Sequence, residues 1–381
     1  MKTNWLKNMA DSFDKKHNKL FDYDVGKQQR YINSFPQPHD NIERSFFQYK
    51  CQMKLFPLYL RIIISIASLP LCLLYMKKKK YDVGKKSKMN AIFLGNGQPS
   101  NIIPKSLFNK FSLIELNPKI GVYLSKRDLR YIKNLVKRYP FSWHFIFKNV
   151  IKISKYSFII EKYNPSALIV SNEYSFTSSL LTDYCQVNSI QHINVMHGEK
   201  LFYMRDAFFK FDNCYVWDEF YVRLLSALRA DERQFVIEIP ESMKIKKERI
   251  CHYDYTYYLG GENRKEMEIT ASYLNLLRKR GNIISIRPHP RYSKIEDVEI
   301  CFKNFNIENF NNISIEDSLC NTKAAISLYS TVLNQALSNN IDIVIDDLTT
   351  PDHFKKLKRL KYICINKPNK KLSEIIDGDI S

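Results

Sequence analysis

Residues 287–291 read Arg-Pro-His-Pro-Arg, which combines anion-binding side chains with a stiff backbone. Residues 283–286, just before them, are typical of a short buried strand, and the two prolines prevent a strand or helix from continuing. In open α/β sheets, ligands bind beyond the carboxyl ends of the strands. Guanidinium and imidazole groups are donors that suit a phosphate. The sequence therefore predicts a phosphate-binding loop that contains Arg287, His289 and Arg291.

A second strand–loop unit of this kind spans residues 324–331. It contains hydroxyl side chains, those of Ser327, Ser330 and Thr331, and it leads into a helical pattern at residues 332–337. Hydroxyls and unpaired amides at a helix start can bind an anion. A serine at this place is also an ordinary helix N-cap, which needs no function. We expect both loops to contact the phosphate of a nucleotide.

Residues that could accept a proton follow two other predicted strands. His197 and Glu199 come after the strand at residues 191–196, and Glu173 comes after the strand at residues 166–170. A histidine or carboxylate at a strand end could take the proton of an acceptor hydroxyl. The alternatives are a tight turn at Gly198 and solvated loop carboxylates. The sequence names three candidates for the base, and it does not choose among them.

Length and composition limit the class of protein. The chain has 381 residues, 45% hydrophobic residues and a formal net charge of +20, so it is long enough for two domains and favours anionic partners. Its eight scattered cysteines form no zinc-binding pattern and fit a reducing cytoplasm. There is no Walker A loop and no Asp-x-Asp pair between predicted strands. We expect metal-independent chemistry without a cofactor.

The N-terminal 88 residues differ from the rest of the chain. Residues 55–75 are mostly apolar, and a lysine-rich stretch at residues 77–88 follows them. About 20 apolar residues can cross a bilayer, although Arg61, Pro57 and Pro70 weaken a simple crossing. The same pattern suits a helix that lies on an anionic membrane. A buried core helix is the third alternative.

From residue 89 onward, strands and helices alternate, which is typical of parallel sheets with helices on both faces. Residues 241–249 are charged and poor in strand formers, so the sequence predicts domains at 1–88, 89–241 and 242–381. A Gly-x-Gly in the loop at residues 95–99 is a weak signal of phosphate binding.

The motifs resemble a known group of enzymes. The run that contains His289, followed by Ser330 and Thr331, resembles the His-Pro and Ser-Ser/Thr motifs of bacterial lipooligosaccharide sialyltransferases and polysialyltransferases. His197 and Gly198, ahead of that His-Pro loop, are similar to the His-Gly motif of CDP-glycerol glycerophosphotransferases. The resemblance implies that His289, Ser330 and Thr331 bind the phosphate of a CMP-activated donor. One departure is that this chain lacks the acidic pair followed by glycine that serves those sialyltransferases as the base motif.

Taken together, we expect an α/β protein with two facing Rossmann-like domains (GT-B type) and a partly helical N-terminal extension. The expected activity is transfer of a sugar from a nucleotide-sugar donor, CMP-linked by preference, to a glycan or glycolipid acceptor in capsule or lipooligosaccharide synthesis. The expected location is the cytoplasmic face of the plasma membrane. A polyol-phosphate transferase that uses a CDP-linked donor is the second interpretation. A non-catalytic protein that binds nucleic acid or membrane is the third, although no nucleic-acid-binding motif supports a nucleic-acid partner.

Overall fold

The structure, a computed structural model, describes residues 24–77, 88–95, 100–116 and 121–378. These residues form two compact units. The first contains the described residues up to His197 together with Phe202–Glu241. The second contains Gly198–Leu201 and the chain from Ser242 onward.

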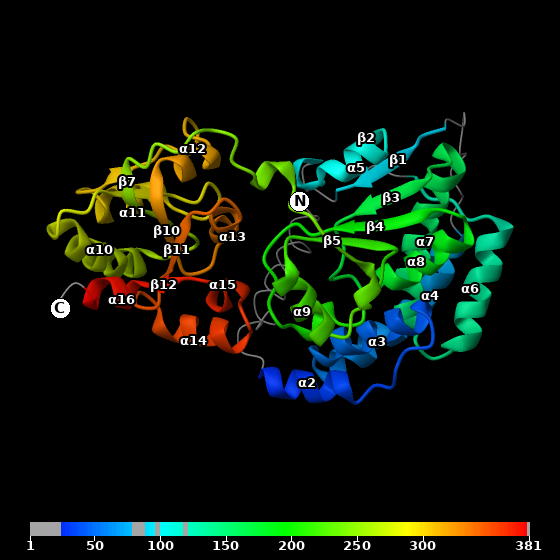
Figure 1. Cartoon of the computed structure of the whole chain (residues 1–381). Helices are drawn as coiled ribbons and strands as arrows, with labels where there is room; N and C mark the ends of the chain where they lie inside the picture. Colours follow the sequence, from blue (N-terminus) through cyan, green and yellow to red (C-terminus); the bar gives the residue numbers. More distant parts are fainter. Residues whose placement is uncertain (1–23, 78–87, 96–99, 117–120, 379–381) are drawn as a thin grey trace. The chain divides into compact units, whose positions relative to one another are not determined.

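The first unit is built on a six-stranded sheet in the order β2-β1-β3-β4-β5-β6, and every pairing in it is parallel. Its strands are β1 (Ala91–Leu94), β2 (Leu113–Glu115), β3 (Ala167–Val170), β4 (Gln191–Val195), β5 (Asn213–Val216) and β6 (Phe235–Ile237). All residues of β1 and β3 are buried, as expected for strands that are covered on both faces. Figure 1 shows β3, β4 and β5 side by side with helices packed against them.

The helices of the first unit after the N-terminal segment are α5 (Lys105–Lys110), α6 (Lys126–Arg138), α7 (Trp143–Tyr163), α8 (Ser178–Val187) and α9 (Glu219–Ala227). A capping box of Ser125 and Asp128 starts α6. The Asp128 carboxylate also accepts hydrogen bonds from Ser157 on α7 and from Tyr184 on α8, at 2.7 Å each. One buried carboxylate therefore ties three helices together.

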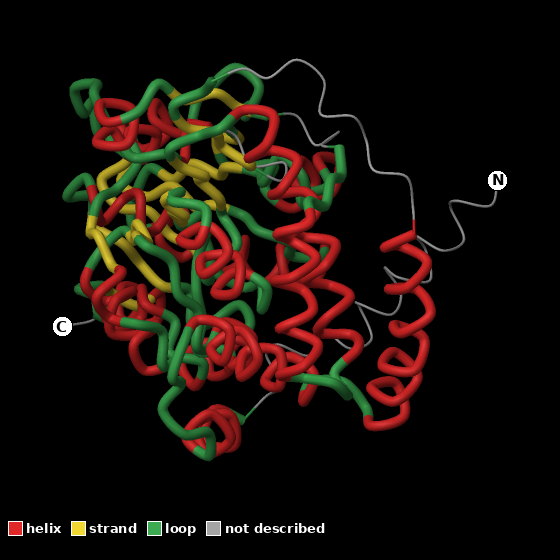
Figure 2. The backbone as a smooth tube through the Cα atoms, turned by 90° about the vertical axis from the view of Figure 1, so that its right-hand side faces the viewer, coloured by secondary structure: helices red, strands yellow, loops and turns green. Residues whose placement is uncertain are grey.

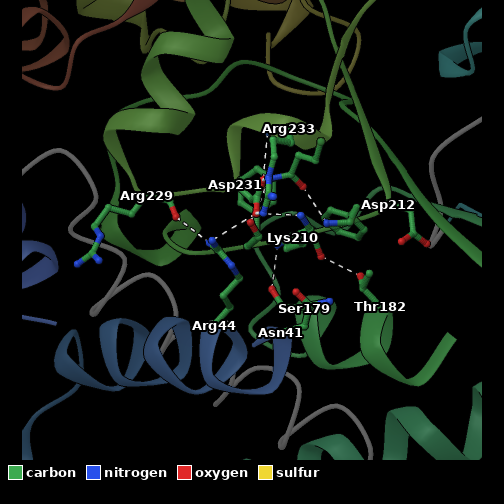
Figure 3. Close-up of polar contacts among 12 residues, drawn as sticks. Asn41, Arg44, Ser179, Thr182, Lys210, Asp212, Arg229, Asp231 and Arg233 are labelled. Carbon is green, nitrogen blue, oxygen red and sulfur yellow. Dashed lines mark hydrogen bonds and ion pairs between the residues drawn. The ribbon is translucent and has the colours of Figure 1, made fainter. Parts of the chain in front are cut away.

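The N-terminal helices α2 (Val25–Asn33), α3 (Asn41–Lys54) and α4 (Leu58–Lys77) also belong to the first unit. Asp24 and Asp40 cap the starts of α2 and α3 by accepting from backbone amides. From α3, Arg44 reaches the carboxylate of Asp231, which also pairs with Lys210 at 2.8 Å and Arg233 at 3.0 Å (Figure 3). Burial acts to raise the pKa of Asp231, but the hydrogen bonds from Arg233 and Lys210 hold it well below its usual value.

Helix α4 is long and apolar enough to cross a membrane by length and composition, and little of it is buried. It packs against α7, where the hydroxyls of Tyr75 and Ser154 lie 2.6 Å apart. In Figure 2, α4 is the helix at the right edge, whose end continues into a grey trace, and other helices lie on only one side of it.

The second unit has a six-stranded parallel sheet in the order β12-β11-β10-β7-β8-β9. Its strands are β7 (Tyr253–Tyr258), β8 (Ile284–Arg287), β9 (Asn306–Ile307), β10 (Thr322–Ser327), β11 (Asp342–Ile345) and β12 (Lys370–Lys371). Its helices are α10 (Arg264–Lys279), α11 (Ile295–Cys301), α12 (Ile315–Cys320), α13 (Thr331–Ser338), α14 (Pro351–Arg359), α15 (Ile363–Asn366) and α16 (Leu372–Asp377). Apolar residues of β7, β8 and β10 pack against α10 and α16 to form its core.

The expected fold class is confirmed: two α/β units, each on a parallel sheet, with a helical N-terminal segment. One element differs. The apolar composition of residues 362–365 predicts a strand, but Ile363–Asn366 forms the short helix α15, and the sheet is extended instead by β12. The predicted Gly-x-Gly loop at residues 95–99 and the lysine-rich stretch at residues 77–88 lie mostly outside the described residues.

Candidate functional site

The carboxyl ends of β3 and β4 bring together two of the predicted bases. These strands are parallel neighbours, so the residues that follow them meet at one edge of the sheet. Nδ1 of His197, after β4, lies 3.7 Å from Oε1 of Glu173, after β3. The same nitrogen contacts the hydroxyl of Ser171. Glu173 is 1% exposed whereas the His197 side chain is 20% exposed, so the carboxylate is inside and the imidazole reaches the surface.

Polar side chains from other elements fix Glu173 in place. Asn194, inside β4, donates its side-chain amide to Oε2 of Glu173 at 3.1 Å and accepts from the backbone of Asn172 at 2.8 Å. Gln48 of α3 donates to the backbone oxygens of Glu173 and Arg205, at 3.0 Å each. Sequence reasoning missed Asn194 and Gln48. An asparagine between Ile193 and Val195 in a predicted strand was a usable signal for Asn194, but nothing in the sequence pointed to Gln48.

A cation lies close to this pair. The guanidinium of Arg205 packs against the rings of Tyr174 at 5.5 Å and Tyr203 at 5.0 Å, and it donates to Asp206 at 2.9 Å. Burial alone would lower the pKa of Arg205, but the neighbouring Asp206 raises it, with a smaller effect from Glu173. Arg205 is therefore a permanent positive charge beside the Glu173–His197 pair, and sequence reasoning missed it as well.

The arrangement of His197 and Glu173 suits proton transfer. An imidazole can take a proton near neutral pH, and a carboxylate beside it stabilises the imidazolium that forms. Glu173 and Ser171 both contact Nδ1 of His197, and a histidine base that is oriented through Nδ1 exchanges its proton with the substrate through Nε2. Glu173 then acts on His197, and it is a positioning residue in this arrangement.

The third predicted base, Glu199, has different partners. It belongs to the second unit, where the side-chain amide of Asn334 on α13 donates to its carboxylate. Lys367 in turn donates to the side-chain oxygen of Asn334. The structure therefore groups His197 with Glu173 and places Glu199 in a separate polar cluster beside α13.

In the second unit, Arg287 at the end of β8 forms a buried ion pair. Its Nη1 lies 2.8 Å from Oε2 of Glu308, and its Nη2 donates to the backbone oxygen of Ile313 at 2.9 Å. The two side chains are 9% and 2% exposed. These contacts indicate that Arg287 stabilises the loop, and its predicted contact with a phosphate stays a prediction.

His289 is held in one orientation by its own loop. Its Nδ1 accepts a hydrogen bond from the backbone amide of Arg291 at 3.0 Å, and its ring stacks on Tyr292 with centroids 4.4 Å apart. Burial and the charge of Arg291 lower the pKa of His289, which favours the neutral ring. Because Nδ1 is the acceptor, the neutral ring carries its proton on Nε2. His289 can thus donate a hydrogen bond to an anion without being charged.

The hydroxyl residues of the second loop have local roles. Ser327 is buried and donates to the backbone oxygen of Tyr258 at 2.9 Å, so it joins two strands. Ser330 is the N-cap of α13 and accepts from the amide of Val332 at 3.2 Å. Thr331 is exposed in the first turn of that helix. Capping explains the contacts of Ser330, while phosphate binding by Ser330 and Thr331 stays a prediction.

The His289 loop and the start of α13 lie at the same edge of the second sheet. They follow β8 and β10, which both pair with β7, so the two strand ends are about 10 Å apart. The loop after β7 runs between them and contains Gly260, Gly261 and Glu262. Glu262 accepts from the amide of Gly260 at 2.6 Å, and burial raises the pKa of Glu262. Two glycines directly after a strand were a signal that sequence reasoning overlooked.

Within the described part of the chain, no group of three or more His, Cys, Asp or Glu side chains is arranged to hold a metal ion. The expectation of metal-independent chemistry stays a prediction.

Comparison with known proteins gives similarity of fold only. No protein-family model matches the sequence, and a search of curated proteins finds no match. Among solved structures, UDP-GlcNAc 2-epimerase from Neisseria meningitidis bound to UDP-GlcNAc is 11% identical and covers 77% of this chain and 90% of its own, with a TM-score of 0.43. The wall teichoic acid polymerase TagF is 12% identical and covers 87% of this chain and 88% of its own, with a TM-score of 0.41. UDP-GlcNAc 2-epimerase from Methanocaldococcus jannaschii is 13% identical and covers 74% of this chain and 93% of its own, with a TM-score of 0.39.

Proposed function

We propose that this protein is a glycosyltransferase that moves a sugar from a nucleotide-activated donor to a hydroxyl of a glycan acceptor. The observation that carries the proposal is the pairing of His197 with the buried Glu173 at the carboxyl ends of β3 and β4. A CMP-linked sugar is the favoured donor, on the resemblance of the His289 loop and of Ser330 and Thr331 to the motifs of CMP-sugar transferases. Synthesis of a cell-surface polysaccharide is the proposed setting.

In the proposed reaction, Nε2 of His197 removes the proton of the acceptor hydroxyl as its oxygen attacks the anomeric carbon of the donor sugar. A bond forms between that oxygen and that carbon, and the bond from the carbon to the phosphate oxygen breaks. The phosphate oxygen leaves with the electron pair as part of the nucleotide. Glu173 stabilises the imidazolium that results, because a buried carboxylate interacts strongly with a neighbouring positive charge.

The second unit supplies the proposed phosphate contacts. His289 donates from Nε2, and the amides and hydroxyls at the start of α13 meet the same phosphate. In this arrangement Arg287 orients the loop through Glu308, and Arg291 adds positive charge at the surface. Cationic and neutral donors of the protein would then take the place of a metal ion in stabilising the leaving group.

Polyol-phosphate transfer from a CDP-linked donor is the second candidate function. It is favoured by the identity of the base, since the residue paired with Glu173 is a histidine followed by glycine, in the order known from CDP-glycerol glycerophosphotransferases. In that reaction the acceptor oxygen attacks phosphorus, and CMP leaves with the electron pair. The same base serves both reactions.

A nucleotide-binding panel tests the donor class. Calorimetric titration of the full chain with CMP, CDP, UMP, UDP and GDP is expected to give selective binding of the cytidine nucleotides. His289→Ala is expected to weaken that binding by about tenfold or more, because one charge-assisted hydrogen bond to phosphate is lost. Equal binding of all five nucleotides, or cytidine binding unchanged in His289→Ala, contradicts the proposed donor site.

Turnover then separates the two reactions and the three candidate bases. Activity with a CMP-sugar and none with CDP-glycerol supports sugar transfer, and the reverse supports polyol-phosphate transfer. With the active donor, His197→Ala is expected to lower kcat by about 10²–10⁴-fold. Glu173→Gln should lower it less than His197→Ala, and Glu199→Gln should stay near the wild type, because Glu199 is bound to Asn334. A loss confined to Glu199→Gln refutes the assignment of His197.

A non-catalytic nucleic-acid-binding protein predicts a different pattern. It would bind RNA or DNA with an affinity that falls steeply with salt, and it would tolerate His197→Ala and His289→Ala. That result, together with no turnover of any cytidine-linked donor, replaces the transferase proposal.

A further inference from the structure

Helix α4 has its polar and apolar sides reversed relative to a helix of a water-soluble protein. The side turned toward α7 carries Ser68 and Cys72, which are buried, and Arg61 and Ser65, which are half-buried. At 100° per residue these positions fall on one side of the helix. A helix on the surface of a soluble protein normally turns such residues to the solvent.

The opposite side of α4 is apolar and exposed. Eight large apolar side chains of this helix are between 49% and 70% exposed: Leu58, Tyr59, Ile62, Ile63, Ile66, Leu71, Leu73 and Leu74. Between Leu58 and Met76 the only charged residue is Arg61, which lies on the side toward α7. Contiguous apolar surface of this kind marks a site of contact with a membrane or with another protein.

The charges around this helix favour an anionic partner. Lys54 and Lys77, just before α4 and at its end, are exposed, and the sequence continues with three more lysines at 78–80. On α7, Lys148, Lys155 and Lys162 recur every seven residues and therefore lie on one side of that helix. They form the row next to Phe147 and Ser154, which contact Tyr75 of α4. No acidic residue occurs in α4.

We infer that the exposed side of α4 lies in the surface of an anionic lipid bilayer, parallel to the membrane plane. A second protein chain would cover the apolar side chains, but it does not account for lysines at both ends of the helix. Crossing the bilayer would require α4 to leave α7 and place Arg61 and its serines in hydrocarbon, at a high energetic cost. When α4 lies in the membrane interface, its polar side stays packed against α7 while its apolar side enters the acyl region, so both sides have a suitable environment.

Vesicle co-sedimentation of the full chain tests this inference without reference to enzyme activity. We expect binding to phosphatidylcholine vesicles that contain about 30% phosphatidylglycerol, and weaker binding to pure phosphatidylcholine, by about fivefold for each lysine at the surface. Ile63→Gln/Ile66→Gln/Leu74→Gln replaces three side chains that are 58%, 70% and 62% exposed, so the fold should be kept. This variant is expected to bind the anionic vesicles about 100-fold more weakly or worse.

The control variant is Ile250→Gln/Ile283→Gln/Ile300→Gln, which makes the same kind of change at side chains of the second unit that are 74%, 51% and 53% exposed. It should bind the vesicles like the wild type, and both variants should keep the wild-type circular dichroism and Tm. Equal loss in both variants overturns the inference. The inference is also overturned if the wild type does not bind vesicles but forms a dimer, and the α4 variant is monomeric, because a second copy would then cover this side. Labels at the two ends of α4 that are accessible from opposite sides of the bilayer would show crossing and also refute it.

Discussion

Arg287 and Glu308 offer a quantitative test of how the His289 loop is built. Sequence reasoning assigned Arg287 to a phosphate, whereas its guanidinium lies 2.8 Å from Glu308 and also donates to Ile313. Both side chains are nearly inaccessible to solvent, so solvent screening reduces their interaction little. They therefore form a buried ion pair, and the stability of the second unit should respond differently to the loss of one charge and of both.

Removal of one partner leaves the other charge buried and unpaired, which typically destabilises a protein by about 3–5 kcal/mol. Arg287→Met and Glu308→Met should each lower the free energy of unfolding of the second unit by about 3 kcal/mol. The double variant removes both charges and replaces them with flexible apolar side chains. It should be about 2–3 kcal/mol more stable than the sum of the single effects predicts, because the two residues are in direct contact.

Urea unfolding, followed by a probe in the second unit, measures these four free energies. Single variants that each lose less than about 1 kcal/mol, or a double variant whose loss equals the sum of the two, refute the buried pair. Cytidine-nucleotide binding by the double variant gives the second result. Binding within about threefold of the wild type shows that nucleotide binding does not need Arg287, while a loss above about tenfold in a folded double variant shows that it does, through contact with the nucleotide or through the orientation of the His289 loop.

Three further predictions concern stability. Asp231→Asn should lower the free energy of unfolding of the first unit by about 3 kcal/mol, since a carboxylate that is 5% exposed loses its ion pairs with Arg44 and Lys210. A change below about 1 kcal/mol in urea unfolding contradicts this prediction. Burial lowers the pKa of His192 to about 3, which is below its value in the unfolded chain, so the unfolded chain binds a proton first as the pH falls. The free energy of unfolding should therefore fall by up to ~1.4 kcal/mol per pH unit as the pH drops below about 6.5. A His192→Gln variant with the same pH dependence would argue against that assignment. Asp346→Ala should destabilise the second unit by about 3 kcal/mol, because the buried carboxylate accepts from the Tyr257 hydroxyl at 2.6 Å and from two backbone amides, and a melting temperature equal to that of the wild type would refute this role.

The sequence predicted the strands well where local composition decides. Runs of β-branched and aliphatic residues such as those of β3 and β11 are short, buried and flanked by loops, and they are strands in the structure. The run at residues 362–365 has the same composition, but there the buried side chains of Ile363 and Cys364 belong to a single helical turn. A four-residue apolar run does not distinguish a strand from a helical turn, because tertiary packing decides between them.

The helices α2 and α3 were harder to foresee for the opposite reason. Their sequences are polar, and on α3 the buried positions include Ser45 and Gln48 as well as aromatic residues. A helix that is fixed by side-chain amides donating to distant backbone oxygens shows little apolar periodicity. Their capping residues, Asp24 and Asp40, were the readable signals.

The site was predictable in its members and not in their grouping. His197, Glu199 and Glu173 were each identified as residues that follow a strand, as rivals for one role. The order of strands in the sheet makes β3 and β4 neighbours, so that His197 and Glu173, two alternative candidates for the base, lie in contact with each other. Glu199 is two residues from His197, yet it contacts α13. Chain order does not reveal strand order, and that step required the structure.

Helix α3 connects the two proposals within the first unit. Gln48 donates to the backbone of Glu173, and Gln52 donates to the backbones of Tyr174 and Arg205. The helix ends at Lys54, and three residues separate it from the start of α4 at Leu58. The segment that supports the proposed proton acceptor is therefore joined directly to the helix inferred to lie on lipid. An acceptor carried on a membrane lipid would suit such an arrangement, since docking of α4 would keep the Glu173–His197 pair close to the bilayer. Loss of turnover on vesicle-bound acceptors in the Ile63→Gln/Ile66→Gln/Leu74→Gln variant, with turnover of soluble acceptors kept, is the expected sign of this connection. Equal loss on both kinds of acceptor would place the effect of α4 in the folding of the unit instead.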